Sequence, residues 1–178
     1  KNTKEISRSH KVITSDNGLV TITGGKWTSY RLMAEDTVDK AIEVCGLPKR
    51  KCVTKKLRIH GYRKNPDLTD HMYVYGSDEP KILQLIEKEP ALGEKLSEKF
   101  GYTLAEVVWA VREEMAITLE DVLARRVRLL FVDAREAIAA APKAAAIMAR
   151  ELGRDQAWID EQVKSFTDLA KNYIFEQK

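Results

Sequence analysis

The residues with the clearest chemical potential form a short glycine-rich turn, Gly24-Gly25-Lys26-Trp27-Thr28. Two adjacent glycines let a backbone approach a ligand closely, because no side chain intervenes. A helix that begins just after them would offer free N–H groups, and the ammonium group of Lys26 would add a full positive charge. This combination suits an anion or an electron-rich ring oxygen. A plain strand-to-helix turn explains the same residues more simply, so their types alone leave both interpretations open.

The turn does not match a nucleotide-hydrolysing phosphate loop. The Walker pattern needs a glycine at the position of Val20 and a serine or threonine at the position of Trp27. We therefore expect no nucleotide hydrolysis.

Metal chemistry finds no support in the histidines and cysteines. Neither group has the spacing of a ligand set, so we expect no metal site. Two cysteines cannot build a disulfide framework, which favours a reducing compartment. The residues concerned are His10, His60, His71, Cys45 and Cys52.

Two charged clusters invite a catalytic interpretation that their geometry disfavours. Glu113 and Glu114 are neighbours on a predicted helix, so their side chains point about 100° apart and make a poor acid–base pair. The arginines of the segment 125–128, with Asp133 and Arg135 close behind, fit a structural ion-pair network better than a site.

The sequence around the turn predicts two strands followed by a helix. Two β-branched runs at 10–14 and 19–23 flank Asn17-Gly18, a dipeptide that favours a hairpin turn. Thr28 would cap a helix over 29–44 that stops at Gly46. One face of that helix should be buried, formed by Met33, Thr37, Ala41 and Val44.

A connector follows over residues 49–64, with eight basic residues and no acidic one. It could contact a polyanion such as acidic lipid headgroups. A solvated linker is the simpler interpretation, because the segment lacks helical amphipathicity. A short strand is expected over 57–60.

From Ser77 onward the pattern predicts a helical bundle with its own core. Trp109 and Trp158 lie on apolar helix faces and should be core residues. Two capped starts, Thr103 with Glu106 and Thr118 with Asp121, are typical of helix N-termini. Asp155 would cap the last helix. The expected helices cover 77–88, 90–99, 104–115, 119–138, 142–153 and 156–173.

The composition fits a globular protein. Of 178 residues, 44% are hydrophobic and 32% charged, and the net charge of +3 is too small to indicate nucleic-acid binding. No apolar run is long enough to cross a membrane, and no signal peptide is visible. The chain begins at Lys1 in an irregular polar stretch, which leads us to expect either a processed chain or a piece of something longer.

Several motifs in order resemble the C-terminal part of the FAD-dependent (aerobic) glycerol-3-phosphate dehydrogenases. The resemblance covers nearly the whole chain. It is carried by the segments 6–10, 18–31, 33–38, 52–62, 106–116 and 118–135.

The resemblance implies an enzyme that oxidises sn-glycerol 3-phosphate to dihydroxyacetone phosphate and passes electrons through FAD to a quinone or to oxygen. It also implies site residues: Arg8 and Lys26 would bind the substrate. Gly24, Gly25, Lys26, Trp27 and Thr28 would lie against the flavin. Reduced flavin carries negative charge near N1 and O2, which a helix N-terminus and a lysine would stabilise.

The family's Gly-x-Gly-x-x-Gly turn for the FAD pyrophosphate is missing from these residues. We therefore predict three parts: residues 1–45 as the tail of a flavin domain, 46–76 as the basic connector, and 77–178 as a complete helical domain. The fold class is mainly α, with a hairpin and helix that belong to an FAD-binding α/β domain.

Alone, the chain should bind FAD weakly or not at all and have no dehydrogenase activity, and the general base should lie elsewhere in the enzyme. We expect a cytoplasmic enzyme with peripheral contact to the cytoplasmic membrane. The alternative is that the helical part is a non-catalytic module for interaction, dimerisation or membrane-surface attachment.

Overall fold

The computed structural model describes residues 9–175, and the chain divides into two compact units, residues 1–59 and 60–178. The division falls inside the predicted connector. The predicted class, mainly α with a helical C-terminal part, is confirmed, because helices dominate and the strands form only two small antiparallel hairpins.

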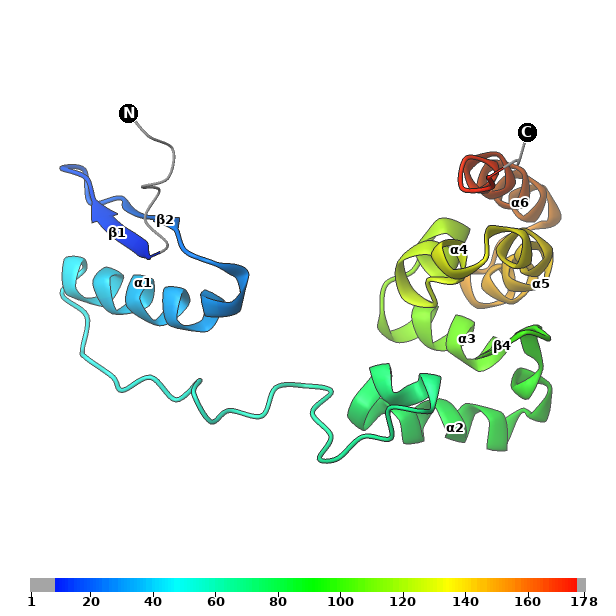
Figure 1. Cartoon of the computed structure of the whole chain (residues 1–178), viewed down its shortest axis with the longest axis horizontal. Helices are drawn as coiled ribbons and strands as arrows, with labels where there is room; N and C mark the ends of the chain where they lie inside the picture. The colour runs from blue at the N-terminus through cyan, green and yellow to red at the C-terminus, as the bar shows by residue number, and fades with distance from the viewer. Residues whose placement is uncertain (1–8, 176–178) are drawn as a thin grey trace. The chain divides into compact units, whose positions relative to one another are not determined.

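The first unit is a hairpin with one helix beside it (Figure 1). Strands β1 (His10–Thr14) and β2 (Val20–Gly24) pair antiparallel in the predicted places, with His10 opposite Gly24. The 3₁₀ turn η2 (Trp27–Ser29) leads into α1 (Tyr30–Val44). Thr28 is therefore not the cap that we expected. It lies inside η2, and Lys26 is the residue that precedes the first turn.

This first unit has no buried core among its described residues, 9–59. The stripe on α1 that we expected to be buried is only half-buried. Large apolar side chains are exposed on the strands and on α1, including Ile13 (50%), Leu32 (46%) and Val38 (56%). The predicted strand at 57–60 is wrong, since those residues form only turn and irregular structure.

The second unit is built from short turns and five α-helices among residues 60–175. Its elements in order are η3 (His71–Asp78), α2 (Glu79–Lys88), η4 (Pro90–Gly93), β3 (Lys95–Ser97), β4 (Phe100–Thr103), α3 (Leu104–Glu113), η5 (Asp121–Arg126), α4 (Leu129–Val132), α5 (Ala134–Leu152) and α6 (Gln156–Lys171).

Helix α5 is central to the core of this unit, and it packs against α3, α4, α6 and β3. Its inward face carries alanines and Met148, so neighbouring helices can approach closely. Trp109 is 8% exposed and belongs to the core as predicted, while Trp158 is half-buried against it.

The predicted helix over 90–99 is wrong. After η4 the chain forms the hairpin β3–β4, in which Lys95 pairs with Thr103 and Ser97 with Phe100. The hairpin buries Leu96 and places the Ser97 hydroxyl 2.6 Å from a carboxylate oxygen of Glu136. These long-range contacts outweigh the local helical pattern.

The single helix predicted over 119–138 is broken in two places. A six-residue π-helical turn, η5, ends near Arg128, whose backbone is left-handed (φ 62°). Asp133 is extended and accepts hydrogen bonds from the amides of Arg135 and Glu136 at 3.0 and 3.1 Å, which starts α5.

Pro142 does not start a helix, contrary to prediction. It lies inside α5 on the exposed face. The ring removes the N–H that would bond to the carbonyl of Ile138, and an exposed position lets water or a slight bend compensate.

Three predicted helix starts are confirmed. The Thr118 amide donates to the Asp121 carboxylate at 2.9 Å and the Asp121 amide donates to the Thr118 hydroxyl at 3.2 Å, and helical residues begin at Leu119. Thr103 and Glu106 form a capping box before α3, and the Asp155 carboxylate accepts from the Trp158 amide at 3.0 Å before α6.

Candidate functional site

The backbone of the Gly24-Gly25 turn can be formed only by glycine. Both residues have positive φ, 79° and 82°. A Cβ on Gly24 would lie 2.9 Å from the Ser9 carbonyl oxygen, and one on Gly25 would lie 2.6 Å from the Met33 sulfur. The turn therefore folds back tightly on β1 and α1, and the absence of side chains leaves its outer backbone bare.

The start of η2 offers donors next to this backbone. The Lys26 amide donates to the Ser29 hydroxyl at 3.2 Å, so it is not free. The amides of Trp27 and Thr28 have no acceptor within residues 9–175. The Lys26 side chain is exposed, and its ammonium group pairs with no carboxylate in the same range. The turn thus presents two amide donors and one cation.

Trp27 lies over the same turn without being packed into it. It is 87% exposed and stacks only on Tyr30, with ring centroids 5.8 Å apart. An exposed tryptophan beside free amides provides a flat apolar surface next to polar donors.

Side-chain contacts hold the turn in place. His10 Nε2 lies 2.6 Å from Asp36 Oδ2 and joins β1 to α1. Arg31 donates to Glu35 at 2.5 Å and to the Thr54 hydroxyl at 3.2 Å, so α1 also binds the start of the connector.

The structure brings five of the six predicted site residues together: Gly24, Gly25, Lys26, Trp27 and Thr28. The sixth, Arg8, lies outside the described residues. The arrangement can bind an electron-rich ring edge or an anion. No group of three or more His, Cys, Asp or Glu within residues 9–175 could hold a metal ion.

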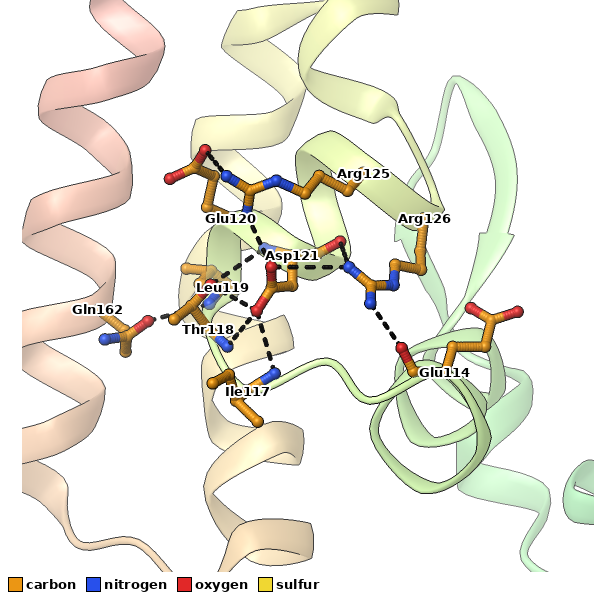
Figure 2. Close-up of polar contacts among 9 residues, drawn as sticks. All are labelled: Glu114, Ile117, Thr118, Leu119, Glu120, Asp121, Arg125, Arg126 and Gln162. Carbon is orange, nitrogen blue, oxygen red and sulfur yellow. Dashed lines mark hydrogen bonds and ion pairs between the residues drawn. The ribbon is translucent and has the colours of Figure 1, made fainter. Parts of the chain in front are cut away.

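Arg125 and Arg126 of the arginine-rich segment bind structural partners (Figure 2). Asp133 pairs with Lys99 instead, so the predicted network of the segment 125–128 with Asp133 and Arg135 is confirmed only in part. Asp121 Oδ2 accepts from the Ile117 amide (3.1 Å), the Thr118 amide (2.9 Å) and the Thr118 hydroxyl (2.8 Å), while Oδ1 accepts from Arg125 (2.7 Å). Arg126 donates to the carbonyl of Glu114 at 2.5 Å.

These contacts fix the charge of Asp121. Partial burial raises its pKa, but the hydrogen bonds from Thr118, Ile117 and Arg125 outweigh burial and lower the pKa to about 2. Gln162 of α6 accepts from the Leu119 amide at 2.9 Å, which ties this loop to the bundle (Figure 2). The cluster is a clamp on the loop between α3 and η5.

Sequence reasoning missed a second polar cluster around Glu106, whose side chain is 1% exposed. Its carboxylate accepts from His71 and Tyr75, which lie 35 and 31 residues away in the chain. The one local signal was the Thr103–Glu106 capping box, and it does not point to the two distant donors.

No helix within residues 9–175 combines the length and apolarity needed to cross a bilayer.

Comparison with known proteins identifies the class. Residues 52–159 match the family described as the C-terminal domain of alpha-glycerophosphate oxidase, which is more than half of the chain. The chain belongs to this family.

Particular relatives extend the match to the first unit. A probable mitochondrial glycerol-3-phosphate dehydrogenase of Caenorhabditis elegans is 34% identical over 98% of this chain. The corresponding Dictyostelium discoideum protein is 35% identical over 98%, and the mitochondrial glycerol-3-phosphate dehydrogenase of Rattus norvegicus is 36% identical over 93%. The match covers 26%, 29% and 25% of these relatives, so the chain spans about a quarter of their length.

Proposed function

We propose that the chain is the C-terminal part of a longer flavoenzyme that oxidises sn-glycerol 3-phosphate to dihydroxyacetone phosphate. The observation that carries the proposal is the alignment of nearly the whole chain with glycerol-3-phosphate dehydrogenases. FAD would supply the hydride acceptor, and a quinone or oxygen would take the electrons.

The glycine-rich turn supports a role against the flavin. Two glycines with positive φ leave backbone bare, and the amides of Trp27 and Thr28 are free in residues 9–175 to donate to a ring oxygen. The Lys26 ammonium group would stabilise negative charge that develops on the ring and the substrate. These residues fit the pyrimidine edge of an isoalloxazine.

Arg8 would hold the phosphate of the substrate, since a guanidinium group donates two parallel hydrogen bonds to such an anion. This role rests on the resemblance of the segment 6–10 to the family.

The exposed apolar surface of the first unit supports its place in a larger domain. The large apolar side chains of Ile13, Leu32 and Val38 are exposed to solvent, and no described residue of this unit is buried. A unit without a core gains stability by packing against more protein. We propose that the rest of the flavin domain covers these residues.

The first test uses the 178-residue chain. It should lose added FAD during gel filtration and should not reduce a dye acceptor with glycerol 3-phosphate. Flavin that co-elutes with the chain, or turnover above the buffer rate, would contradict its assignment as a part without the main FAD-binding motif.

The second test uses the longer protein that contains these residues. Lys26→Ala and Arg8→Ala should each lower kcat/KM for glycerol 3-phosphate by about tenfold or more, as expected when one charge-assisted contact is lost. Lys164→Ala is the matched control, because Lys164 is an exposed lysine on α6 of the second unit. Equal kinetics for Lys26→Ala and Lys164→Ala would remove Lys26 from the site.

A second candidate function is attachment through the connector and the helical unit. The basic residues at 49–51, 55–56 and 58 are all exposed, and the segment 49–64 has no acid. We propose contact with anionic lipid headgroups as this alternative. The chain should then sediment with anionic vesicles at low salt and be released at high salt, whereas equal sedimentation with neutral vesicles would exclude it.

A further inference from the structure

The second unit contains a cavity of about 410 Å³ that lies apart from the glycine-rich turn. It is formed by η3, β4, α3 and the segment that joins η5 to α4. The residues that decide its chemistry are His71, Tyr75, Glu106, Arg126, Arg128 and Phe131. This volume is typical of cavities that hold small molecules.

The carboxylate of Glu106, which lines this cavity, already has several hydrogen-bond donors. Glu106 Oε2 accepts from the Thr103 amide (2.7 Å), the Thr103 hydroxyl (3.2 Å) and His71 Nε2 (3.1 Å), and Oε1 accepts from the Tyr75 hydroxyl (3.1 Å). The hydrogen bond that His71 donates to Glu106 raises the pKa of His71 and favours its charged form. Glu106 therefore has little capacity left to attract a cation.

The two arginines of the cavity differ in what they bind. Arg126 is occupied, since it donates to the Glu114 carbonyl and lies 3.6 Å from Asp121 Oδ1. Arg128 is exposed. Its carbonyl accepts from the Phe131 amide at 3.1 Å, but its guanidinium group has no hydrogen bond or ion pair with any residue in 9–175. Its charge acts on Tyr102, in the wall of the same cavity: burial raises the pKa of Tyr102, and the charge of Arg128 opposes that rise. Among residues 9–175, Arg128 therefore gives the cavity a guanidinium group without a partner.

The backbone of Arg128 adds an independent observation. Its φ of 62° is left-handed, a conformation that glycine or asparagine adopts more easily than arginine. Strained residues of this kind are frequent at ligand sites. Here the strain holds an unpaired guanidinium group at the cavity.

The outer wall of the cavity is apolar and open. Phe131 and Val132 of α4 are 56% and 55% exposed, and Val74 of η3 is 64% exposed. A ligand with an apolar portion would cover part of this surface.

We propose that the cavity binds a small organic anion, a carboxylate or a phosphate monoester that carries an aromatic or short aliphatic group. The anion pairs with Arg128, and its apolar portion packs on Phe131 and Val74. The two anion types share this recognition, and separate titrations distinguish them.

Isothermal titration calorimetry with the 178-residue chain tests the proposal. The probes are phenyl phosphate, benzoate, inorganic phosphate and benzyl alcohol. Phenyl phosphate, benzoate or both should bind saturably at one site per chain, and more tightly than inorganic phosphate or benzyl alcohol. The tighter of the two identifies the preferred anion.

The variant Arg128→Gly separates binding from folding. It removes the cation and relieves the left-handed backbone, so its melting temperature should not fall, while its affinity should drop about tenfold or more with the charge-assisted hydrogen bond. Arg154→Ala is the matched control, because Arg154 is an exposed arginine that does not line this cavity.

Four results would overturn the proposal. They are no saturable binding of either organic anion, equal affinity for benzyl alcohol, equal affinity for inorganic phosphate, and Arg128→Gly binding as tightly as the unchanged chain.

Discussion

Replacing Asp121 by asparagine should destabilise the helical unit by about 2 kcal/mol at pH 7. The substitution keeps the side-chain volume and removes the charge that receives the hydrogen bonds from Ile117, Thr118 and Arg125. The amide oxygen of an asparagine can still accept a hydrogen bond, but its NH₂ group would then face one of these donors without an acceptor. The loop between α3 and η5 loses its clamp.

The magnitude comes from the pKa of Asp121. The protein lowers it from 3.8 to about 2, and each pKa unit corresponds to about 1.4 kcal/mol, which gives about 2.4 kcal/mol as an upper value. The side chain is only 16% exposed, so screening by solvent reduces this modestly.

The sign of the pH dependence follows from the lowered pKa. The stabilisation is fully present above the unfolded pKa near 4 and is lost as the pH falls toward about 2. The stability difference between Asp121→Asn and the unchanged chain should therefore be constant from pH 7 to pH 5 and should shrink below pH 4.

Urea unfolding followed by the fluorescence of the tryptophans, including the buried Trp109, measures this difference. Asp168→Asn is the control, because Asp168 forms an exposed pair with Lys171 and should change the unfolding free energy by less than about 0.5 kcal/mol. The reasoning is refuted if both variants behave alike at pH 7, or if the Asp121 carboxyl titrates by NMR with a pKa at or above 3.8.

Three further predictions concern other positions. Gly76→Ala should destabilise by about 3 kcal/mol or more, because φ is positive and a Cβ would overlap the Gly61 carbonyl, whereas Gly153→Ala, with open space, should cost about 1 kcal/mol in urea unfolding. The His71 imidazole should titrate by NMR above 6.5, because its hydrogen bond to Glu106 raises its pKa. The stability that this charged pair adds to the folded chain is present below pH 6.5 and is lost as the pH rises through the folded pKa. A titration at or below 6.5 would contradict this. Trp27→Ala should leave the unfolding free energy of this chain unchanged within about 0.5 kcal/mol, because the side chain is exposed; a larger loss would mean that Trp27 packs in the fold.

Local signals predicted the elements that depend on neighbours in sequence. Asn17-Gly18 placed the first hairpin, and the capping residues Thr103 and Asp155 placed α3 and α6. Turn geometry and hydrogen bonds between residues three positions apart determine these features, and the residue types that they need can be recognised directly in a sequence.

Elements that depend on distant partners were missed. The hairpin β3–β4 exists because Leu96 enters the core and Ser97 meets Glu136, 39 residues away. The break before α5 had a readable signal, Asp133 with Glu136 three residues later, but a continuous apolar stripe masked it. Pro142 led to the wrong prediction of a helix start, because a proline on the exposed face of a helix is tolerated.

The candidate site was predictable only in part. The two glycines predicted a tight turn. The structure adds which amides are free to donate: within residues 9–175, the amides of Trp27 and Thr28 have no acceptor, whereas the Lys26 amide has one. The cavity beside Arg128 left no pattern in the sequence, because tertiary folding assembles it from segments far apart in the chain.

Anaerobic mixing of glycerol 3-phosphate with the longer protein that contains these residues tests the central claim most directly. Absorbance of oxidised flavin should bleach on mixing, about tenfold or more slowly in Lys26→Ala, and at the unchanged rate in Lys164→Ala. Flavin that stays oxidised in the unchanged protein, or that bleaches equally fast in Lys26→Ala, would contradict the account.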